Sequence, residues 1–68
     1  MVSIYVNNCG WVLGLDKQGK IHYTHFRDGA KMWPSEFDKE FVFCARQAQQ
    51  QGHRIDKVHR YDILAQDN

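Results

Sequence analysis

Residues 35–52, SEFDKEFVFCARQAQQQG, decide the fold because they carry the only helical pattern in the chain. Ser35 is a favoured N-cap residue, and Asp38 follows three residues later in an arrangement like a capping box. Gly52 suits the position just after a helix end, where the backbone turns left-handed. The stretch therefore predicts a helix from about residue 36 to residue 51.

An apolar stripe runs along one side of this expected helix when residues are spaced at about 100°. The stripe consists of Phe37, Phe41, Cys44, Ala45 and Ala48. We expect it to cover a sheet, with its small residues letting the helix lie close. Phe43 falls roughly 120° or more from the centre of the stripe, beside Lys39 and Arg46. Packing against a nearby loop and exposure in an interface both remain open for Phe43.

Strands are expected on both sides of the helix. The segments 2–6 (VSIYV), 11–16 (WVLGLD) and 20–26 (KIHYTHF) alternate apolar and polar residues, and turn sequences separate them. A last strand is expected over 55–64, followed by a frayed tail at 65–68. The order β-β-β-α-β predicts an α+β fold, with one helix packed on one face of an antiparallel four-stranded sheet. Residues 1–68 form a single small domain.

One helix covers only one face of such a sheet, so the other face is expected to be open. Alternation places Tyr5, Val12, His22, Thr24 and Phe26 on that open face. Trp11 is expected in the core, and Trp33 against the first turn of the helix. The parity of the last strand is ambiguous. If Val58 points inward, then the open face also gains His59, Tyr61 and Ile63.

Composition excludes several classes of protein. A domain of 68 residues buries only about 60% of its unfolded surface, which leaves little room for an enclosed active-site pocket. A net charge of +1 gives no electrostatic argument for binding duplex nucleic acid. Two cysteines are too few for a disulfide scaffold and favour reduced thiols. No signal peptide or membrane-spanning run is visible, so we expect a cytoplasmic protein without membrane contact.

No group of side chains predicts a metal or catalytic site. The possible ligands are His22, His25, His53, His59, Cys9 and Cys44, and none of them shows zinc-ligand spacing. Cys9 with a histidine is a conceivable nucleophile and base, whereas Cys44 is expected to be buried and inert. The glycines form no phosphate-binding loop. We therefore expect no enzyme activity, no cofactor and no metal.

The chain resembles very small phage and prophage proteins in its overall pattern. The segments that carry the resemblance are IYVNNCGWVLGLD (4–16), GAKMWPSEFDKEFVFCA (29–45) and RIDKVHRYDIL (54–64). They match a hairpin, a segment of the type A-K-x-aromatic that leads into an alanine-rich helix, and a closing strand. The resemblance implies an inhibitor that occupies a surface on a bacterial protein, such as an anti-CRISPR protein or an RNA polymerase inhibitor. No functional residue carries over from it.

The sequence therefore favours a non-enzymatic protein-binding module that sterically blocks a host complex, such as a CRISPR effector or another host enzyme. Such an inhibitor would act in the host cytoplasm. The candidate partner-binding residues are Phe43, Arg46 and Lys39 on the helix, and Tyr5, His22 and Phe26 on the open face. One set would serve the partner and the other a homodimer, because a core this small gains stability by association.

Single-stranded nucleic acid is the alternative partner. Bases would stack on Tyr5, Phe26 and Tyr61 of the open face. Arg27, Lys31 and Arg60 would provide the positive edge.

Overall fold

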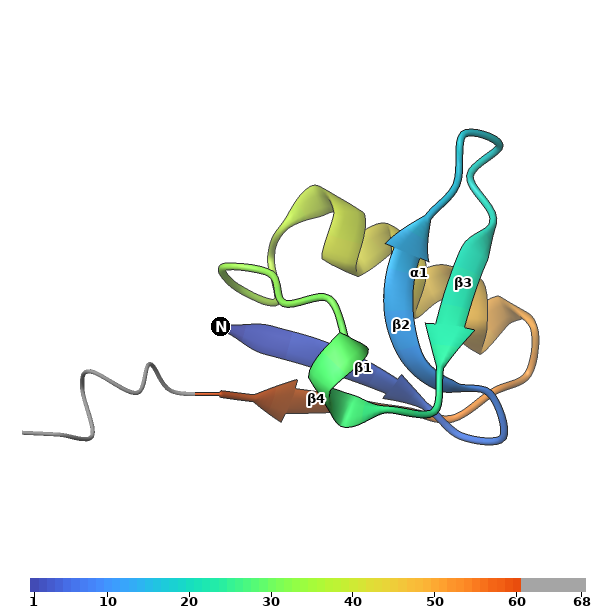
Figure 1. The fold of residues 1–68 in the computed structure, drawn as a ribbon. Helices are drawn as coiled ribbons and strands as arrows, with labels where there is room; N and C mark the ends of the chain where they lie inside the picture. Colours follow the sequence, from blue (N-terminus) through green and yellow to red (C-terminus); the bar gives the residue numbers. More distant parts are fainter. Residues whose placement is uncertain (61–68) are drawn as a thin grey trace, which may run out of the picture.

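Four strands and one α-helix make up the computed structural model, which describes residues 1–60. The elements are β1 (Val2–Val6), β2 (Gly10–Leu15), β3 (Ile21–Thr24), the 3-10 helix η1 (Arg27–Gly29), α1 (Lys39–Gln50) and β4 (Ile55–His59). The strands form one antiparallel sheet in the order β3-β2-β1-β4, and α1 packs on one face of it (Figure 1). The α+β fold expected from the sequence is confirmed.

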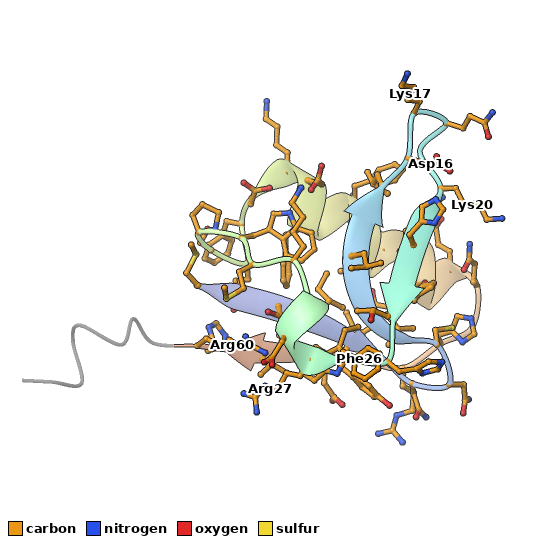
Figure 2. All side chains as sticks on the ribbon, viewed as in Figure 1. Asp16, Lys17, Lys20, Phe26, Arg27 and Arg60 are labelled. Atoms are coloured by element: carbon orange, nitrogen blue, oxygen red, sulfur yellow. The ribbon has the colours of Figure 1, made fainter. Side chains whose placement is uncertain are left out.

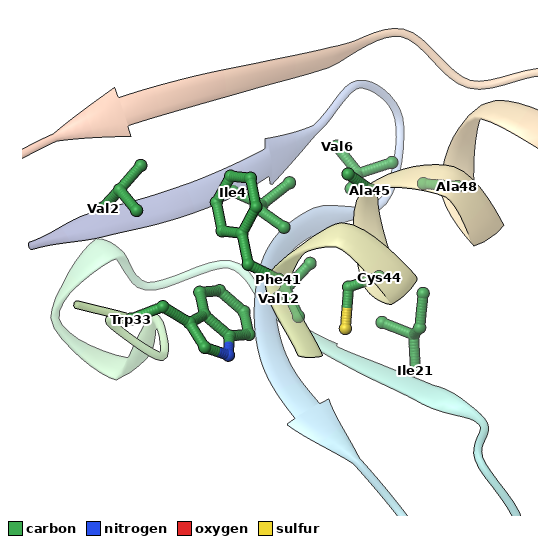
Figure 3. Close-up of a cluster of buried hydrophobic side chains, with 10 residues drawn as sticks. All are labelled: Val2, Ile4, Val6, Val12, Ile21, Trp33, Phe41, Cys44, Ala45 and Ala48. Atoms are coloured by element: carbon green, nitrogen blue, oxygen red, sulfur yellow. The ribbon is translucent and has the colours of Figure 1, made fainter. Parts of the chain in front are cut away.

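The core lies between α1 and the two central strands, β1 and β2. Its members are Val2, Ile4, Val6, Val12, Ile21, Trp33, Phe41, Cys44, Ala45 and Ala48 (Figure 3). Phe41, Cys44, Ala45 and Ala48 are the buried residues of α1. The last three of these are small, and Phe41 supplies the one large buried side chain of the helix.

The helix begins later than the sequence predicts. Asp38, and not Ser35, is the N-cap: its Oδ1 accepts hydrogen bonds from the backbone N–H of Glu40 (2.9 Å) and Phe41 (3.4 Å). Ser35 instead closes a turn before the helix, where its Oγ accepts from the N–H of Phe37 at 3.2 Å. Phe37 was expected on the buried stripe, but it lies in this turn and is 83% exposed. The helix end is as predicted, since Gly52 follows it with a φ of 90°.

The alternation expected for the second strand is wrong. Val12 was placed on the open face, but it is fully buried in the core, whereas Leu13 is 44% exposed. The turn after β1 pairs Tyr5 with Trp11, so Trp11 shares the face of Tyr5 and stands outside the core. A register shift between Val12 and Gly14 then marks a β-bulge. Such a bulge breaks the period of two from which the faces were predicted.

The face opposite α1 is partly covered by η1 and the residues around it. Ser3, which alternation places on this face, is fully buried. Gly29 of η1 packs against Thr24 and Leu13, and Arg60 Nη2 donates to the carbonyl oxygen of Arg27 at 3.1 Å. This face is therefore less open than the sequence suggests.

The register of β4 against β1 shows on which face of the sheet each side chain of β4 lies. Val58 pairs with Ser3, so Val58 shares the face opposite α1, and His59 lies on the α1 side. Residues 61–64 of the expected strand, with Tyr61 and Ile63, lie outside the described residues, as does the tail at 65–68.

The segment 31–33 is hydrogen-bonded into the sheet between the start of β1 and β2. Val2 and Trp33 exchange both backbone hydrogen bonds at 2.9 Å, and Lys31 N–H donates to the carbonyl oxygen of Val12 at 2.9 Å. The Trp33 ring meets the Phe41 ring edge-on at 5.4 Å between centroids. The expected packing of Trp33 against the first turn of the helix is confirmed.

Candidate protein-binding surfaces

The outer side of α1 carries an exposed aromatic ring between cations. The residues of this helix surface are Lys39, Val42, Phe43, Arg46, Gln47 and Gln50, which line a shallow hollow of about 300 Å³. Helical spacing brings them together, because positions three, four and seven apart share one side. Phe43 is 45% exposed there. Its packing against the rest of the domain is therefore partial.

The helix surface is positively charged. Within residues 1–60, Lys39 and Arg46 form no ion pair, whereas Lys31 and Lys57 are each paired with a glutamate. Lys39 and Arg46 are exposed, and both line the hollow together with Phe43. The structure therefore brings together all three helix residues that the sequence proposed, as one apolar ring flanked by two cations.

A second set of aromatic side chains lies on the other side of the sheet. This aromatic surface consists of Tyr5, Trp11, Phe26 and Arg27. The Tyr5 and Trp11 rings meet edge-on at 5.1 Å, and the Arg27 guanidinium carbon lies 5.9 Å from the centroid of the Trp11 ring. Phe26 is 77% exposed, and Figure 2 shows it at the same end of the sheet as Arg27. Tyr5 is half-buried, and its ring packs against the ring of Trp11.

His22 does not join the aromatic surface. Its Nε2 lies 3.0 Å from Asp16 Oδ2, and Asp16 Oδ1 accepts from the backbone N–H groups of Gln18 and Lys20. Figure 2 shows Asp16 and Lys20 at the β2–β3 turn. The N–H of Lys20 and then the His22 ring hold the pKa of Asp16 below its usual value. We interpret His22 as a residue that closes this turn.

Two of the three basic residues that were expected to bind nucleic acid contact other parts of the domain instead. Lys31 pairs with Glu40 and lies 5.7 Å from the centroid of the Trp33 ring. Arg60 donates to the carbonyl oxygen of Arg27 at 3.1 Å. Of the three expected basic residues, Arg27 alone stands beside an aromatic ring of the aromatic surface. A continuous basic edge beside the aromatic rings is therefore not formed by these residues.

The two thiols differ in their surroundings. Burial raises the pKa of Cys44 to about 11, so this thiol stays protonated and unreactive near neutral pH. Cys9 is half-buried, with its Sγ 3.6 Å from His53 Nε2. Within residues 1–60, no carboxylate is bonded to the His53 ring as an orienting group, and no three His, Cys, Asp or Glu side chains gather as a metal site.

Sequence reasoning missed Trp11 as a surface residue and missed one ion cluster. The short turn at 7–9 requires Tyr5 to pair with Trp11, so counting the hairpin register would have found Trp11. The cluster of Glu36 with Lys57 (3.7 Å) and His59 (3.3 Å) joins the turn before α1 to β4. No local pattern signals a contact between segments so far apart in the sequence.

Comparison of the chain with protein-family models, with curated proteins and with solved structures found no match. Among residues 1–60, no helix is both long enough and apolar enough to cross a membrane.

Proposed function

We propose that this protein is a non-enzymatic binding module that attaches to another protein through the helix surface. The observation that supports this proposal is the Phe43 ring, which is 45% exposed between Lys39 and Arg46 over a shallow hollow. Aromatic and arginine side chains are the usual anchors of protein interfaces. Because α1 is held by a core on its other side, these side chains are presented on a rigid element, which lowers the entropy lost on binding.

The side chains of the helix surface indicate what kind of site the partner would offer. A complementary site would offer an apolar pocket for Phe43 and carboxylates for Lys39 and Arg46. The resemblance to small phage proteins supports a more specific form of the proposal, in which the partner is a bacterial defence complex or another host enzyme. The mechanism would be steric occlusion: the domain covers a working surface of the complex, and no bond is made or broken.

Capture from nuclease-treated bacterial lysate tests the helix surface directly. The comparison is between wild type, Phe43→Ala and Phe37→Ala. Phe37 is the matched control, because its ring is 83% exposed but lies outside the helix surface. We expect Phe43→Ala to weaken capture of a discrete host protein by about tenfold or more, as truncation of an interface anchor does. Capture by Phe37→Ala should equal that of wild type. Circular dichroism would show that both variants remain folded.

Two outcomes would contradict the proposal. Equal losses in both phenylalanine variants would indicate non-specific adhesion of exposed rings. If nucleic acid alone is recovered without nuclease, and Phe26→Ala abolishes that recovery, then the aromatic surface is the binding site. A steep fall of affinity with salt would accompany that second result, because binding to phosphates releases counterions.

A further inference from the structure

Strand β4 lies at one edge of the sheet and has one described neighbour, β1. The N–H of Arg60 donates to the carbonyl oxygen of Met1 at 2.7 Å, and the N–H of Asn7 donates to that of Arg54 at 2.8 Å. In an antiparallel pair, alternate residues bond to the neighbouring strand. Residues 54, 56, 58 and 60 therefore bond toward β1. The backbone groups of Ile55, Lys57 and His59 point away from it, where no described strand pairs with them.

The side chains of this edge strand are sorted by face. Asp56, Val58 and Arg60 lie on the face opposite α1, because their partners in β1 include Ser3 and Tyr5. Lys57 and His59 lie on the α1 side, where both contact Glu36. An edge of this kind accepts another strand, and the charges along it determine which strand fits.

We propose that a second copy of this chain pairs with β4 in antiparallel fashion, with the two-fold axis at Val58. In this register Val58 faces Val58 of the second copy, and Asp56 faces Arg60 of the second copy. Lys57 of one copy lies opposite His59 of the second copy. The outward N–H and C=O groups of these two residues face each other, so the two residues exchange backbone hydrogen bonds. The two sheets would join into one continuous sheet with an isologous interface.

Charge complementarity favours this register over those with an axis at Asp56 or Lys57. An axis at Asp56 would set Asp56 against Asp56, and an axis at Lys57 would set Lys57 against Lys57. Like charges directly opposite each other destabilise a strand pair. An axis at Ile55 would oppose Asp56 to Arg54, but it would engage little of β4 beyond residues 55–57. The axis at Val58 combines opposite charges with longer overlap. This proposal uses the strand edge, not Phe43, and so stands independently of the proposed function.

The oligomeric state of the whole chain tests the proposal. The proposed pair spans only residues 56–60, which is a small interface, so light scattering should cover protein concentrations from about 10 µM to about 1 mM. The informative variants are His59→Pro and its matched control His59→Ala. Both remove the imidazole, but only proline removes the outward N–H, and edge strands tolerate proline. We expect the mass of wild type and of His59→Ala to rise toward that of a dimer, and that of His59→Pro to stay monomeric.

A constant monomeric mass of wild type over this range would overturn the proposal, as would equal association of His59→Pro. Cysteine cross-linking tests the register without relying on the proline variant. Facing residues at the axis would have Cα atoms about 4.5 Å apart, within disulfide range. Val58→Cys should therefore form a covalent dimer on mild oxidation, and Asp56→Cys and Ile55→Cys should not. Cross-linking by either of the latter two variants in preference to Val58→Cys would exclude the proposed axis.

Discussion

Three phenylalanines within seven residues have three different environments. Phe41 is 1% exposed, Phe43 is 45% exposed and Phe37 is 83% exposed. Helical geometry separates Phe41 from Phe43, because two residues along a helix turn the side chain by about 200°. Periodicity therefore predicted those two positions correctly. Phe37 could not be placed, because Ser35 and Asp38 are both good caps and only the tertiary structure shows which one begins the helix.

Alanine substitutions at Phe37 and Phe41 should differ widely in their effect on stability. Phe41→Ala leaves a cavity beside Trp33 and should lower the free energy of unfolding by about 3–5 kcal/mol. Phe37→Ala removes an exposed ring and should change it by less than about 0.5 kcal/mol. Urea denaturation monitored by tryptophan fluorescence would measure both. A large loss for Phe37→Ala would show that the turn before α1 is packed in a way that its exposure does not indicate.

At the scale of elements, Trp33 and Lys31 hold the segment before α1 against the helix, because both contact Glu40 of α1. Trp33 is 2% exposed, and its Nε1 donates to Glu40 Oε1 at 3.0 Å. Lys31 also contacts this carboxylate. Lys31 and then Trp33 lower the pKa of Glu40 below its usual value of 4.5. The carboxylate therefore stabilises the fold above the unfolded pKa, and this contribution is lost as the pH falls through the lower folded pKa.

Substitutions of Glu40 separate its charge from its role as an acceptor. Glu40→Gln keeps an acceptor for the indole N–H and should flatten the loss of stability below about pH 4.5, because the titrating group is gone. Glu40→Ala leaves a buried N–H without a partner and should cost about 1–3 kcal/mol at neutral pH. Thermal unfolding as a function of pH would measure both effects. An unchanged acid transition in Glu40→Gln would assign that transition to other carboxylates.

The strands show where local patterns stop being informative. Alternation identified the first three strands, and helical spacing identified the helix that follows them, since each pattern is local. It failed within β2, because the bulge between Val12 and Gly14 depends on how β2 pairs with β3. Gly10 has a φ of 115°, and a Cβ there would lie 2.6 Å from the carbonyl oxygen of Thr24. A glycine in the sequence marks such a place but does not reveal which strand approaches it.

At the scale of the whole molecule, the candidate surfaces were predicted only in part. The helix surface was found because helical spacing alone groups Lys39, Phe43 and Arg46. The aromatic surface was found only in part: alternation proposed Tyr5 and Phe26 for this face, but it missed Trp11, whose position depends on the hairpin register. The position of β4 beside β1 likewise comes from a pairing between distant segments. Neither local propensity nor periodicity contains that information.

Cys44 provides a probe of opening of the whole core. It is fully buried between α1 and the sheet, whereas Cys9 is half-buried in a turn. A thiol-alkylating reagent near neutral pH should therefore modify Cys9 first. If labelling of Cys44 requires global unfolding, a stability of about 5 kcal/mol slows it by roughly several thousand-fold relative to the unfolded chain.

Mass spectrometry of partly labelled protein would measure the two labelling rates.

The raised pKa of Cys44 adds a test based on pH. Stability should fall as the pH rises from the ordinary thiol value of 9.0 toward about 11, because the unfolded chain gains charge that the core excludes. Cys44→Ala should show a smaller alkaline loss, of which the remainder belongs to groups such as Tyr23, whose pKa is also raised by burial. Comparable labelling rates for Cys44 and Cys9 in the native protein would show that the helix detaches from the sheet without global unfolding.

The central place of β1 has a consequence for how the chain folds during synthesis. Val2, Ile4 and Val6 precede their partners in β4 by 57, 53 and 49 residues. At about 5–20 residues per second, a ribosome needs several seconds to complete that interval. During this time an apolar strand is exposed on the nascent chain without its final neighbour. The native sheet can therefore form only after β4 has left the ribosome, and until then β1 lacks one of its two neighbours in the sheet.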